Sequence, residues 1–261
     1  MDYIKYAVLG IVQALTEFLP ISSTAHIKIF EIILKLPYST TLDIFLHLGT
    51  LLATIIYFKD VIISYIRKYF NEIMWVVFFT IIFAFIIDKI SYFQRPELLS
   101  VFLFVNAIFL FIIDKNLKKE NHLNKDVKAL SIIDLFLIGF FQGLSAIPSL
   151  SRSGSTIFAS ILAKLNPYEA FRFSFIVSIP TIALAFIYEL IKFFKDKTYL
   201  NEDINLIGVI IAIIFSFIFG IIALKILDNF IKQQKVSFFV IYNIVLGVIL
   251  SFYLGFFIKF F

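Results

Sequence analysis

The sequence predicts an all-α fold: a polytopic membrane bundle of about six spanning helices and two re-entrant helix-loop-helix hairpins, arranged as an inverted-topology repeat. Hydrophobic residues make up 61% of its 261 residues and the mean hydropathy is +0.98, whereas soluble domains are about 45–50% apolar. The apolar runs are continuous, and an outer-membrane barrel would alternate apolar and polar residues instead. We therefore expect residues 1–261 to form a single integral membrane domain with no separate soluble domain.

Six apolar stretches are predicted to cross the membrane. A spanning helix needs roughly 20 apolar residues, and the two shortest stretches reach that length only with neighbours at their ends. Two others contain a residue that interrupts the apolar run, His47 in one and Pro180 in the other. In chain order the six stretches are residues 42–58, 73–87, 98–113, 171–191, 204–224 and 236–258.

Four shorter apolar pieces flank two polar runs, residues 13–26 and 142–156. An apolar segment of about 10–14 residues is often re-entrant, and irregular backbone at membrane depth is tolerated only where protein buries it or where it lines a cavity. Both polar runs are therefore expected at the tips of re-entrant hairpins. The arms are residues 4–15 and 27–36 in the first hairpin, and 130–147 and 156–165 in the second.

The two polar runs also predict an internal repeat, with halves at roughly residues 3–113 and 130–258. Three spans lie between the runs, and this odd number puts the second hairpin on the opposite face of the membrane. The binding site of an inverted repeat is expected near the bilayer midplane, where Glu17 and Arg152 would meet. The residues that align are Leu9-Gly10 with Ile138-Gly139, Gln13 with Gln142, Leu15 with Leu144, Thr16 with Ser145 and, after a one-residue slip, Leu19-Pro20 with Ile147-Pro148.

The charge distribution indicates a multi-pass protein of the plasma membrane and no nucleic-acid partner. The net charge is +5, and basic loops of membrane proteins usually lie in the cytoplasm. Loops 59–72, 114–128 and 225–235 carry eleven Lys and Arg residues while the other face carries seven, so both termini are expected outside. The chain has no Cys, and no cleavable signal peptide is expected because polar residues interrupt the first apolar stretch.

Arg152 is the candidate anion-binding residue of the second polar run. Its guanidinium offers a planar fork of donors that matches phosphate oxygens. Gly154 allows a close backbone approach, and amides at the start of a helix favour an anion. Alternatively, Arg152 lies in an ordinary loop and the neighbouring hydroxyl residues only cap the next helix. The predicted substrate-binding residues of this run are Ser151, Ser153, Gly154 and Thr156.

Glu17 is the candidate acid of the first polar run, and Gln13 lies one helical turn before it. A carboxylate at this position can bind a divalent cation together with phosphate oxygens, or it can take a proton. Gln13 and Glu17 are therefore the predicted metal ligands, with Mg²⁺ or Ca²⁺ as the cation. The alternative is that Glu17 forms an ion pair with Arg152 that holds the hairpins together, and the two roles are compatible.

Ser23 and His26 complete the predicted catalytic set with Glu17 and Arg152. His26 is a candidate general base, nucleophile or general acid, and Ser23 is a candidate nucleophile or phosphate donor. The predicted substrate-binding residues of the first half are Ser22, Thr24 and His47, although a lone His on an apolar face such as His47 is as often structural.

Three motifs resemble the undecaprenyl pyrophosphate phosphatase family, also known as the bacitracin-resistance proteins. The first is Gln13-x-x-x-Glu17-Phe18-Leu19-Pro20-x-Ser22-Ser23-Thr24-x-His26, which is similar to E-x-x-x-E-F-L-P-x-S-S-T-x-H. The second is His47-Leu48-Gly49-Thr50, and the third is Pro148-Ser149-x-Ser151-Arg152-Ser153-Gly154-x-Thr156, which is similar to P-G-x-S-R-S-G-x-T. The resemblance covers essentially the whole chain.

The resemblance implies a phosphatase that releases inorganic phosphate from a polyprenyl diphosphate and recycles the monophosphate carrier for cell-envelope glycan synthesis. It implies that Glu17 binds the divalent cation or polarises the nucleophile, that Ser23 and His26 are catalytic, and that Arg152 holds the diphosphate. The expected partners are the lipid substrate, the bilayer and a second copy in a homodimer. The site is expected to open on the extracytoplasmic side.

Two positions depart from the family pattern. Gln13 replaces the first Glu and so loses a charge, and Ser149 replaces the Gly after the second Pro. The alternative function is a polyprenyl-phosphate flippase or an anion transporter, because inverted repeats with re-entrant hairpins also form transporters. A purely structural scaffold would not need Glu17, His26 and Arg152 at membrane depth.

Overall fold

The computed structural model describes residues 2–36, 40–95, 97–118, 124–195 and 205–257, and it is helical throughout these ranges except for connections and one isolated bridge between Lys125 and Leu165. Ten α-helices and two short 3₁₀ helices form in this part of the chain. The α-helices are α1 Asp2–Phe18, α2 Ser23–Leu34, α3 Thr40–Tyr57, α4 Lys59–Asp88, α5 Leu98–Leu117, α6 Ile132–Leu144, α7 Arg152–Leu162, α8 Pro167–Lys195, α9 Leu206–Lys232 and α10 Ser237–Phe257. The 3₁₀ helices are η1 Ser91–Gln94 and η2 Val127–Ala129.

The predicted all-α membrane fold is confirmed at the level of its helices. Each of the ten predicted apolar pieces coincides with one α-helix. Among the described residues α4, α5, α8 and α9 are long and apolar enough to cross a membrane, and residues 42–57, 132–144 and 237–253 form shorter apolar helices. The helix predicted at 73–87 begins earlier, at Lys59, because the basic segment before it is also helical; a non-helical residue, Tyr69, separates the two parts.

Serine residues set the starts of the short helices. Ser22 caps α2 by accepting a hydrogen bond from the amide of Ala25, and Ser151 caps α7 by accepting one from the amide of Gly154. Ser131 and Asp134 form a reciprocal capping box at the start of α6. A side-chain oxygen at the N-cap satisfies an amide that has no partner inside the helix, so the polar runs end one helix and begin the next.

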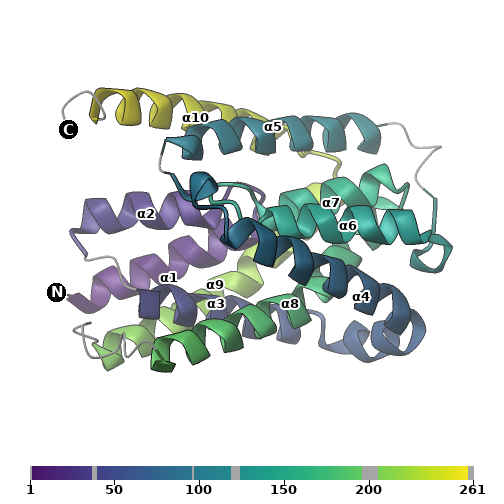
Figure 1. Ribbon diagram of the computed structural model, residues 1–261, viewed down its shortest axis with the longest axis horizontal. Coiled ribbons are helices and arrows are strands. Elements are labelled where there is room, and N and C mark those ends of the chain that lie inside the picture. The colour runs from purple at the N-terminus through teal and green to yellow at the C-terminus, as the bar shows by residue number, and fades with distance from the viewer. Residues whose placement is uncertain (1, 37–39, 96, 119–123, 196–204, 258–261) are drawn as a thin grey trace.

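The helices form a bundle in which α1 and α2 lie in one half of its length and α6 and α7 in the other (Figure 1). α1 packs along α9, α6 packs along α4, and α5 packs along α10. The connections α1–α2 and α6–α7 come together in the middle of the bundle. The start of α1 and the end of α10 lie at the same end of the molecule (Figure 1).

A cluster of phenylalanine rings anchors the end of α1 below the α1–α2 loop. Phe18 is fully buried, and its ring centroid lies 5.8 Å from that of Phe175 on α8. Phe175 in turn packs against Phe58 and Phe171. Aromatic pairs at these distances and tilts are favourable, so the residue next to Glu17 is fixed in the core.

The end of the bundle opposite the chain termini is tied by polar contacts between α4 and the segment before α6. Asp126 accepts hydrogen bonds from Tyr69 and Lys68, and Lys128 pairs with Glu72. The hydrogen bond from Tyr69 and the charge of Lys68 lower the pKa of Asp126 below its usual value. The ionised carboxylate therefore holds this connection against α4.

Candidate active site

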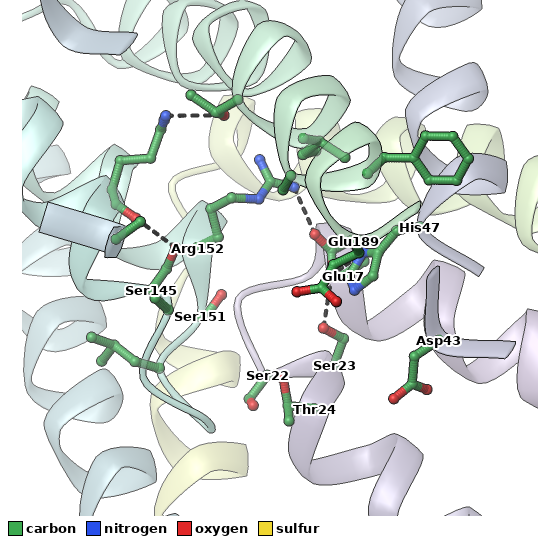
Figure 2. A pocket seen from close by; sticks show the side chains of 18 of the residues that line it. Glu17, Ser22, Ser23, Thr24, Asp43, His47, Ser145, Ser151, Arg152 and Glu189 are labelled. Carbon is green, nitrogen blue, oxygen red and sulfur yellow. Dashed lines mark hydrogen bonds and ion pairs between the residues drawn. The ribbon is translucent and has the colours of Figure 1, made fainter. Parts of the chain in front are cut away.

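A pocket of about 570 Å³ lies where the α1–α2 and α6–α7 loops meet, and helices α3, α4 and α8 complete its wall. Figure 2 shows Glu17, Ser23, His47 and Arg152 close together in it, with Asp43 farther out. The wall is mixed: hydroxyl and charged groups gather around Glu17, while Ile44, Leu150 and Ile182 contribute apolar surface. A polar centre with apolar walls suits a ligand with a charged head and a hydrocarbon tail.

Glu17 is the centre of the polar group. Its Oε1 lies 2.7 Å from Nη2 of Arg152, and its Oε2 accepts a hydrogen bond of 2.7 Å from Oγ of Ser23. Gln13 Nε2 lies 3.4 Å from the same Oε2, and Nδ1 of His47 lies 3.9 Å from it. Only 7% of the Glu17 side chain is exposed, so these neighbours replace the water that a free carboxylate would have.

Helix ends bring the three central residues together. Glu17 is in the last turn of α1, Ser23 is the first residue of α2, and Arg152 is the first residue of α7. The pocket is therefore lined by the starts of α2 and α7, whose first amides favour negative charge. This arrangement can hold a phosphate group between a guanidinium, a hydroxyl and backbone amides.

Both loops contain a non-glycine residue with a positive φ. Ser22 has φ 72° and ψ 104°, and Ser149 has φ 71°. L-residues avoid these angles, and holding one there costs about 1–3 kcal/mol. Ser149 stands where the resembled family has Gly, so the backbone keeps a conformation that suits glycine although the side chain is serine.

The structure brings seven of the twelve predicted site residues to the pocket wall and leaves five outside it. The lining residues are Glu17, Ser22, Ser23, Thr24, His47, Ser151 and Arg152. Five residues lie behind the wall and are buried by surrounding protein: Gln13, His26, Ser153, Gly154 and Thr156.

Four of these five residues support the wall from behind. Gln13 turns its amide nitrogen towards both Glu17 and His47, which lies 3.1 Å away. Ser153 contacts the Ser151 hydroxyl, and Thr156 donates to the carbonyl of Arg152. A Cβ atom at Gly154 would lie 2.9 Å from Oδ1 of Asn106 and 3.3 Å from Pro20 Cβ. Gly154 therefore lets the second loop approach the first loop, not a ligand.

His26 faces away from the pocket. Its Nδ1 lies 2.6 Å from the carbonyl oxygen of Ser22, and its Nε2 lies 2.6 Å from the hydroxyl of Tyr242 on α10. Because a carbonyl oxygen can only accept, Nδ1 carries the proton and Nε2 accepts from Tyr242. Both ring nitrogens are thus used by the protein.

Several pocket residues had no role in the sequence prediction. Thr80, Gln142 and Thr181 form a hydroxyl and amide wall, in which Gln142 Nε2 contacts both threonine hydroxyls. Asp43, Glu189 and Lys192 line the outer part of the pocket. Gln142 aligns with Gln13 in the predicted repeat, and this signal alone points to it. Thr80 and Thr181 are single polar residues in the middle of predicted spans, and Asp43, Glu189 and Lys192 are single polar residues at span ends.

The described residues contain no group of three or more His, Cys, Asp or Glu side chains that could hold a metal ion. The Glu17 oxygens face Arg152 and Ser23, and the Gln13 amide presents its nitrogen to them. Mg²⁺ and Ca²⁺ take six or more oxygen ligands, and Mg²⁺ is commonly held by one or two carboxylates plus substrate phosphates. The donor set fits a cation only when a diphosphate supplies most of the oxygens.

The chain is similar to known proteins over nearly its whole length. A family model described as "Bacitracin resistance protein BacA" matches residues 6–249. Undecaprenyl-diphosphatase 4 of Bacillus cereus is 32% identical over 249 residues, which cover 93% of each chain. The undecaprenyl-diphosphatase of Methanobrevibacter smithii is 31% identical and covers 93% of this chain and 94% of its own. That of Methanococcus vannielii is 34% identical, with 90% and 93% covered.

Proposed function

The chain belongs to the bacitracin resistance protein BacA family, and from this membership and its pocket we propose that it is an undecaprenyl-diphosphatase: a membrane phosphatase that releases inorganic phosphate from a polyprenyl diphosphate and leaves the monophosphate carrier. The relatives that carry the name undecaprenyl-diphosphatase match over more than 90% of their own length. Recycling of the carrier serves cell-envelope glycan synthesis.

One observation carries the proposal: Glu17, Ser23 and Arg152 meet in one pocket although they come from two distant polar runs. Phosphoryl transfer depends mainly on positioning and on stabilising charge on the phosphoryl oxygens. A guanidinium provides that charge, a hydroxyl can attack phosphorus, and a carboxylate in contact with the hydroxyl can take its proton. The pocket holds one group for each task.

In the first step the Ser23 hydroxyl attacks the terminal phosphorus of the diphosphate. Glu17 takes the hydroxyl proton, the new bond forms between Oγ and phosphorus, and the bond from phosphorus to the bridging oxygen breaks. The electron pair of that bond stays on the bridging oxygen, and Glu17 passes the proton to the departing polyprenyl monophosphate. Arg152, with its five donors, holds the phosphate oxygens as charge develops.

In the second step water replaces Ser23 on phosphorus. Glu17 takes a proton from the attacking water and returns it to Oγ of Ser23 as the bond between Oγ and phosphorus breaks. Inorganic phosphate leaves and Ser23 is regenerated. Glu17 is favoured over His26 as the proton acceptor because it is Glu17 that accepts the Ser23 hydrogen bond, whereas both nitrogens of His26 are engaged elsewhere.

Glu17 would hold a Mg²⁺ or Ca²⁺ ion together with the oxygens of the bound diphosphate. Such an ion neutralises charge on the diphosphate and its leaving group. Gln13 would help only after its amide group turns its oxygen towards the ion, since the nitrogen faces Glu17. The cation is therefore proposed to bind together with the substrate and not to the substrate-free protein.

The two helix pairs α1–α2 and α6–α7 are proposed to be re-entrant hairpins of an inverted repeat. In each half, the two helices that flank the polar run are followed by three helices of 18 or more residues, and α1 packs on α9 as α6 packs on α4. The aligned Gly10 and Gly139 support this, since a Cβ atom at each would lie 2.5 Å and 2.6 Å from the facing helix. Small residues at both contacts allow close helix packing at membrane depth.

The pocket is proposed to open on the extracytoplasmic side. Its outer residues Asp43, Glu189 and Lys192 lie near the start of α3 and the end of α8, at the end of the bundle where the chain termini lie (Figure 1). The described basic segments 59–72, 114–118, 124–128 and 225–235 lie towards the other end (Figure 1). Residues 59–72 and 225–232, predicted as loops, are parts of α4 and α9. The positive-inside rule assigns this end to the cytoplasm. Of the basic residues counted for the two faces, Lys119, Lys197 and Lys259 lie outside the described residues.

A phosphate-release assay on purified protein with defined polyprenyl diphosphates tests the function. Release of one phosphate per substrate, with the monophosphate as the other product, is the expected result. Release of no phosphate from any polyprenyl diphosphate, together with movement of the lipid across vesicle membranes, would instead establish a flippase.

A further inference from the structure

Helix α10 carries two neighbouring polar residues, Tyr242 and Asn243, within a mainly apolar sequence. The Asn243 side chain is fully buried, and Tyr242 packs against the buried core. Buried polar groups in a membrane helix are costly unless they have partners. Both residues find partners more than 200 residues away in the chain: Asn243 bonds to Pro20 in the α1–α2 loop, and Tyr242 bonds to His26 in the first turn of α2.

The first partner is the carbonyl oxygen of Pro20. Asn243 Nδ2 donates to it over 3.0 Å, and Nδ2 of Asn106 on α5 donates to it over 2.9 Å. The two asparagines also bond to each other, because Asn106 Nδ2 lies 2.9 Å from Oδ1 of Asn243. A carbonyl oxygen has two lone pairs, so the two helices together satisfy Pro20 fully and fix the start of the loop.

The second partner is His26, whose ring bonds to Tyr242 through one nitrogen and to Ser22 through the other. The Tyr242 hydroxyl donates to Nε2 of His26, and Nδ1 of His26 donates to the Ser22 carbonyl. The imidazole also stacks on the Tyr242 ring, with centroids 5.7 Å apart. This chain of two hydrogen bonds fixes the end of the loop.

The second fixed point is the carbonyl of Ser22, a strained residue that lies directly before Ser23. With φ 72° and ψ 104°, Ser22 holds a conformation that an isolated serine avoids. Backbone strain of this kind persists only where surrounding contacts impose it. The imposed conformation places Ser22 as the cap of α2 and brings Oγ of Ser23 to 2.7 Å from Glu17.

We infer that Tyr242, Asn243, Asn106 and His26 form a clamp that presets the reactive loop, and that His26 is a positioning residue and not a reacting group. The inference rests on the proposed phosphatase activity of the same pocket. His26 does not line that pocket, and neither of its nitrogens faces it. The clamp acts through the Ser22 backbone on the orientation of the Ser23 hydroxyl.

Substitutions at His26 separate positioning from chemistry. The Asn side chain places its amide nitrogen where His places Nδ1, so His26→Asn can keep the bond to Ser22 although it can be neither base nor nucleophile. We expect His26→Asn to retain kcat within about tenfold, because one lost hydrogen bond is worth about 1 kcal/mol. His26→Ala releases the loop, and a misplacement of about 1 Å costs roughly 100-fold in kcat. KM should change less than kcat in both variants, because Arg152 and the apolar part of the pocket wall are not held by His26.

Tyr242→Phe removes only the hydroxyl that His26 Nε2 accepts from. We expect a fall in kcat of about tenfold or less with unchanged KM. In the His26→Asn background the same change should have almost no further effect, because the bond is already absent. Tyr188→Phe, a matched change of an exposed tyrosine on α8, should have wild-type kinetics.

Hydrogen exchange of residues 18–26 gives a readout that does not depend on activity. Exchange should be faster in His26→Ala and Asn243→Ala than in wild type, and unchanged in Tyr188→Phe. Equal, complete loss of activity in His26→Asn and His26→Ala, without a change in exchange, would overturn the clamp and make His26 a reacting group. Wild-type protein that releases no phosphate would refute the proposed function, and the exchange data would still decide whether the clamp exists.

Discussion

Oε1 of Glu17 lies 2.7 Å from Nη2 of Arg152, although 135 residues separate the two in the chain. Both side chains are largely buried, with exposed fractions of 7% and 14%. Two charges of opposite sign at this depth satisfy each other, and each becomes costly when its partner is removed. The pair therefore joins the two loops and keeps a guanidinium and a carboxylate ready at the pocket.

Removal of either charge should abolish phosphate release. Glu17→Ala leaves Arg152 without its carboxylate, and Arg152→Ala removes the donor fork for the phosphate oxygens. Each single variant should lower kcat/KM at least 1000-fold, the range found when a charge that stabilises phosphoryl transfer is lost, while the protein is still expressed. Full activity of either purified variant would refute its assignment.

Stability measurements on the same variants separate the structural part of the pair from its chemistry. A single substitution leaves a buried charge unpaired, which costs about 3–5 kcal/mol, so both single variants should melt at lower temperature than wild type. The double variant Glu17→Ala/Arg152→Ala should recover much of that stability and remain inactive. Additive losses of stability would mean that the two side chains do not interact in the protein.

The Ser23 hydroxyl donates to Oε2 of Glu17, and this contact predicts a phosphoserine intermediate. Ser23→Ala should release phosphate at least 1000-fold more slowly, since activated nucleophiles and their bases act as one unit. Rapid acid quenching of wild type with labelled substrate should trap label that is stable in acid and labile in base, as a phosphate ester is. Ser64→Ala, the same change at an exposed serine on α4, is the matched control and should still trap label.

A different trapped species would exclude this mechanism. Phosphohistidine is labile in acid, so acid-labile label on His26 would exclude Ser23 as the primary attacking group. Normal activity of Ser23→Ala would mean that water attacks the terminal phosphorus directly. Either outcome leaves the phosphatase assignment in place and changes only the attacking group.

Chelation should stop catalysis without loosening the protein. The cation is proposed to be held by Glu17 and the diphosphate together, because the described residues contain no cluster of three metal-binding side chains. A chelator should therefore abolish phosphate release, and added Mg²⁺ or Ca²⁺ should restore it. The melting temperature of the substrate-free protein should not change with chelator or cation, since a ligand shifts stability only when it binds the folded state. A large shift would indicate a site made by protein alone.

The continuity and length of the apolar runs were sufficient to predict the helices, because a lipid environment leaves few alternatives to a continuous apolar helix. Residues 98–113, 206–224 and 237–257 of three predicted spans each lie within one helix, and residues 204 and 258 of those spans lie outside the described residues. The start of α4 was predicted too late, since the basic segment from Lys59 is helical in spite of its charges. Hydropathy detects the apolar part of a helix and does not detect an amphipathic extension.

The meeting of Glu17 and Arg152 was also predictable, because charged groups at membrane depth require partners and each polar run offered only one. The orientation of the His26 ring could not be predicted, since the position of His26 in the motif does not determine which neighbours its ring nitrogens face. Its partner Tyr242 lies 216 residues away and belongs to no motif. Asn106 and Asn243 each look like a single polar residue in an apolar span, and only the folded bundle shows that they share Pro20 as a partner.

Ser149→Gly should stabilise the protein. Ser149 has φ 71°, and a non-glycine residue in this region is strained by about 1–3 kcal/mol. Glycine relieves that strain and loses about 0.5–1 kcal/mol through the greater freedom of the unfolded chain, so the net gain is about 1 kcal/mol. The buried Ser149 hydroxyl forms no hydrogen bond within the described residues, so its removal costs nothing further.

Ser22→Gly is the informative comparison, because Ser22 has a similar φ but caps α2 and precedes Ser23. The melting temperature should rise in Ser149→Gly with kcat unchanged, whereas Ser22→Gly should lose activity; a lower melting temperature in Ser149→Gly would show that its backbone is not strained.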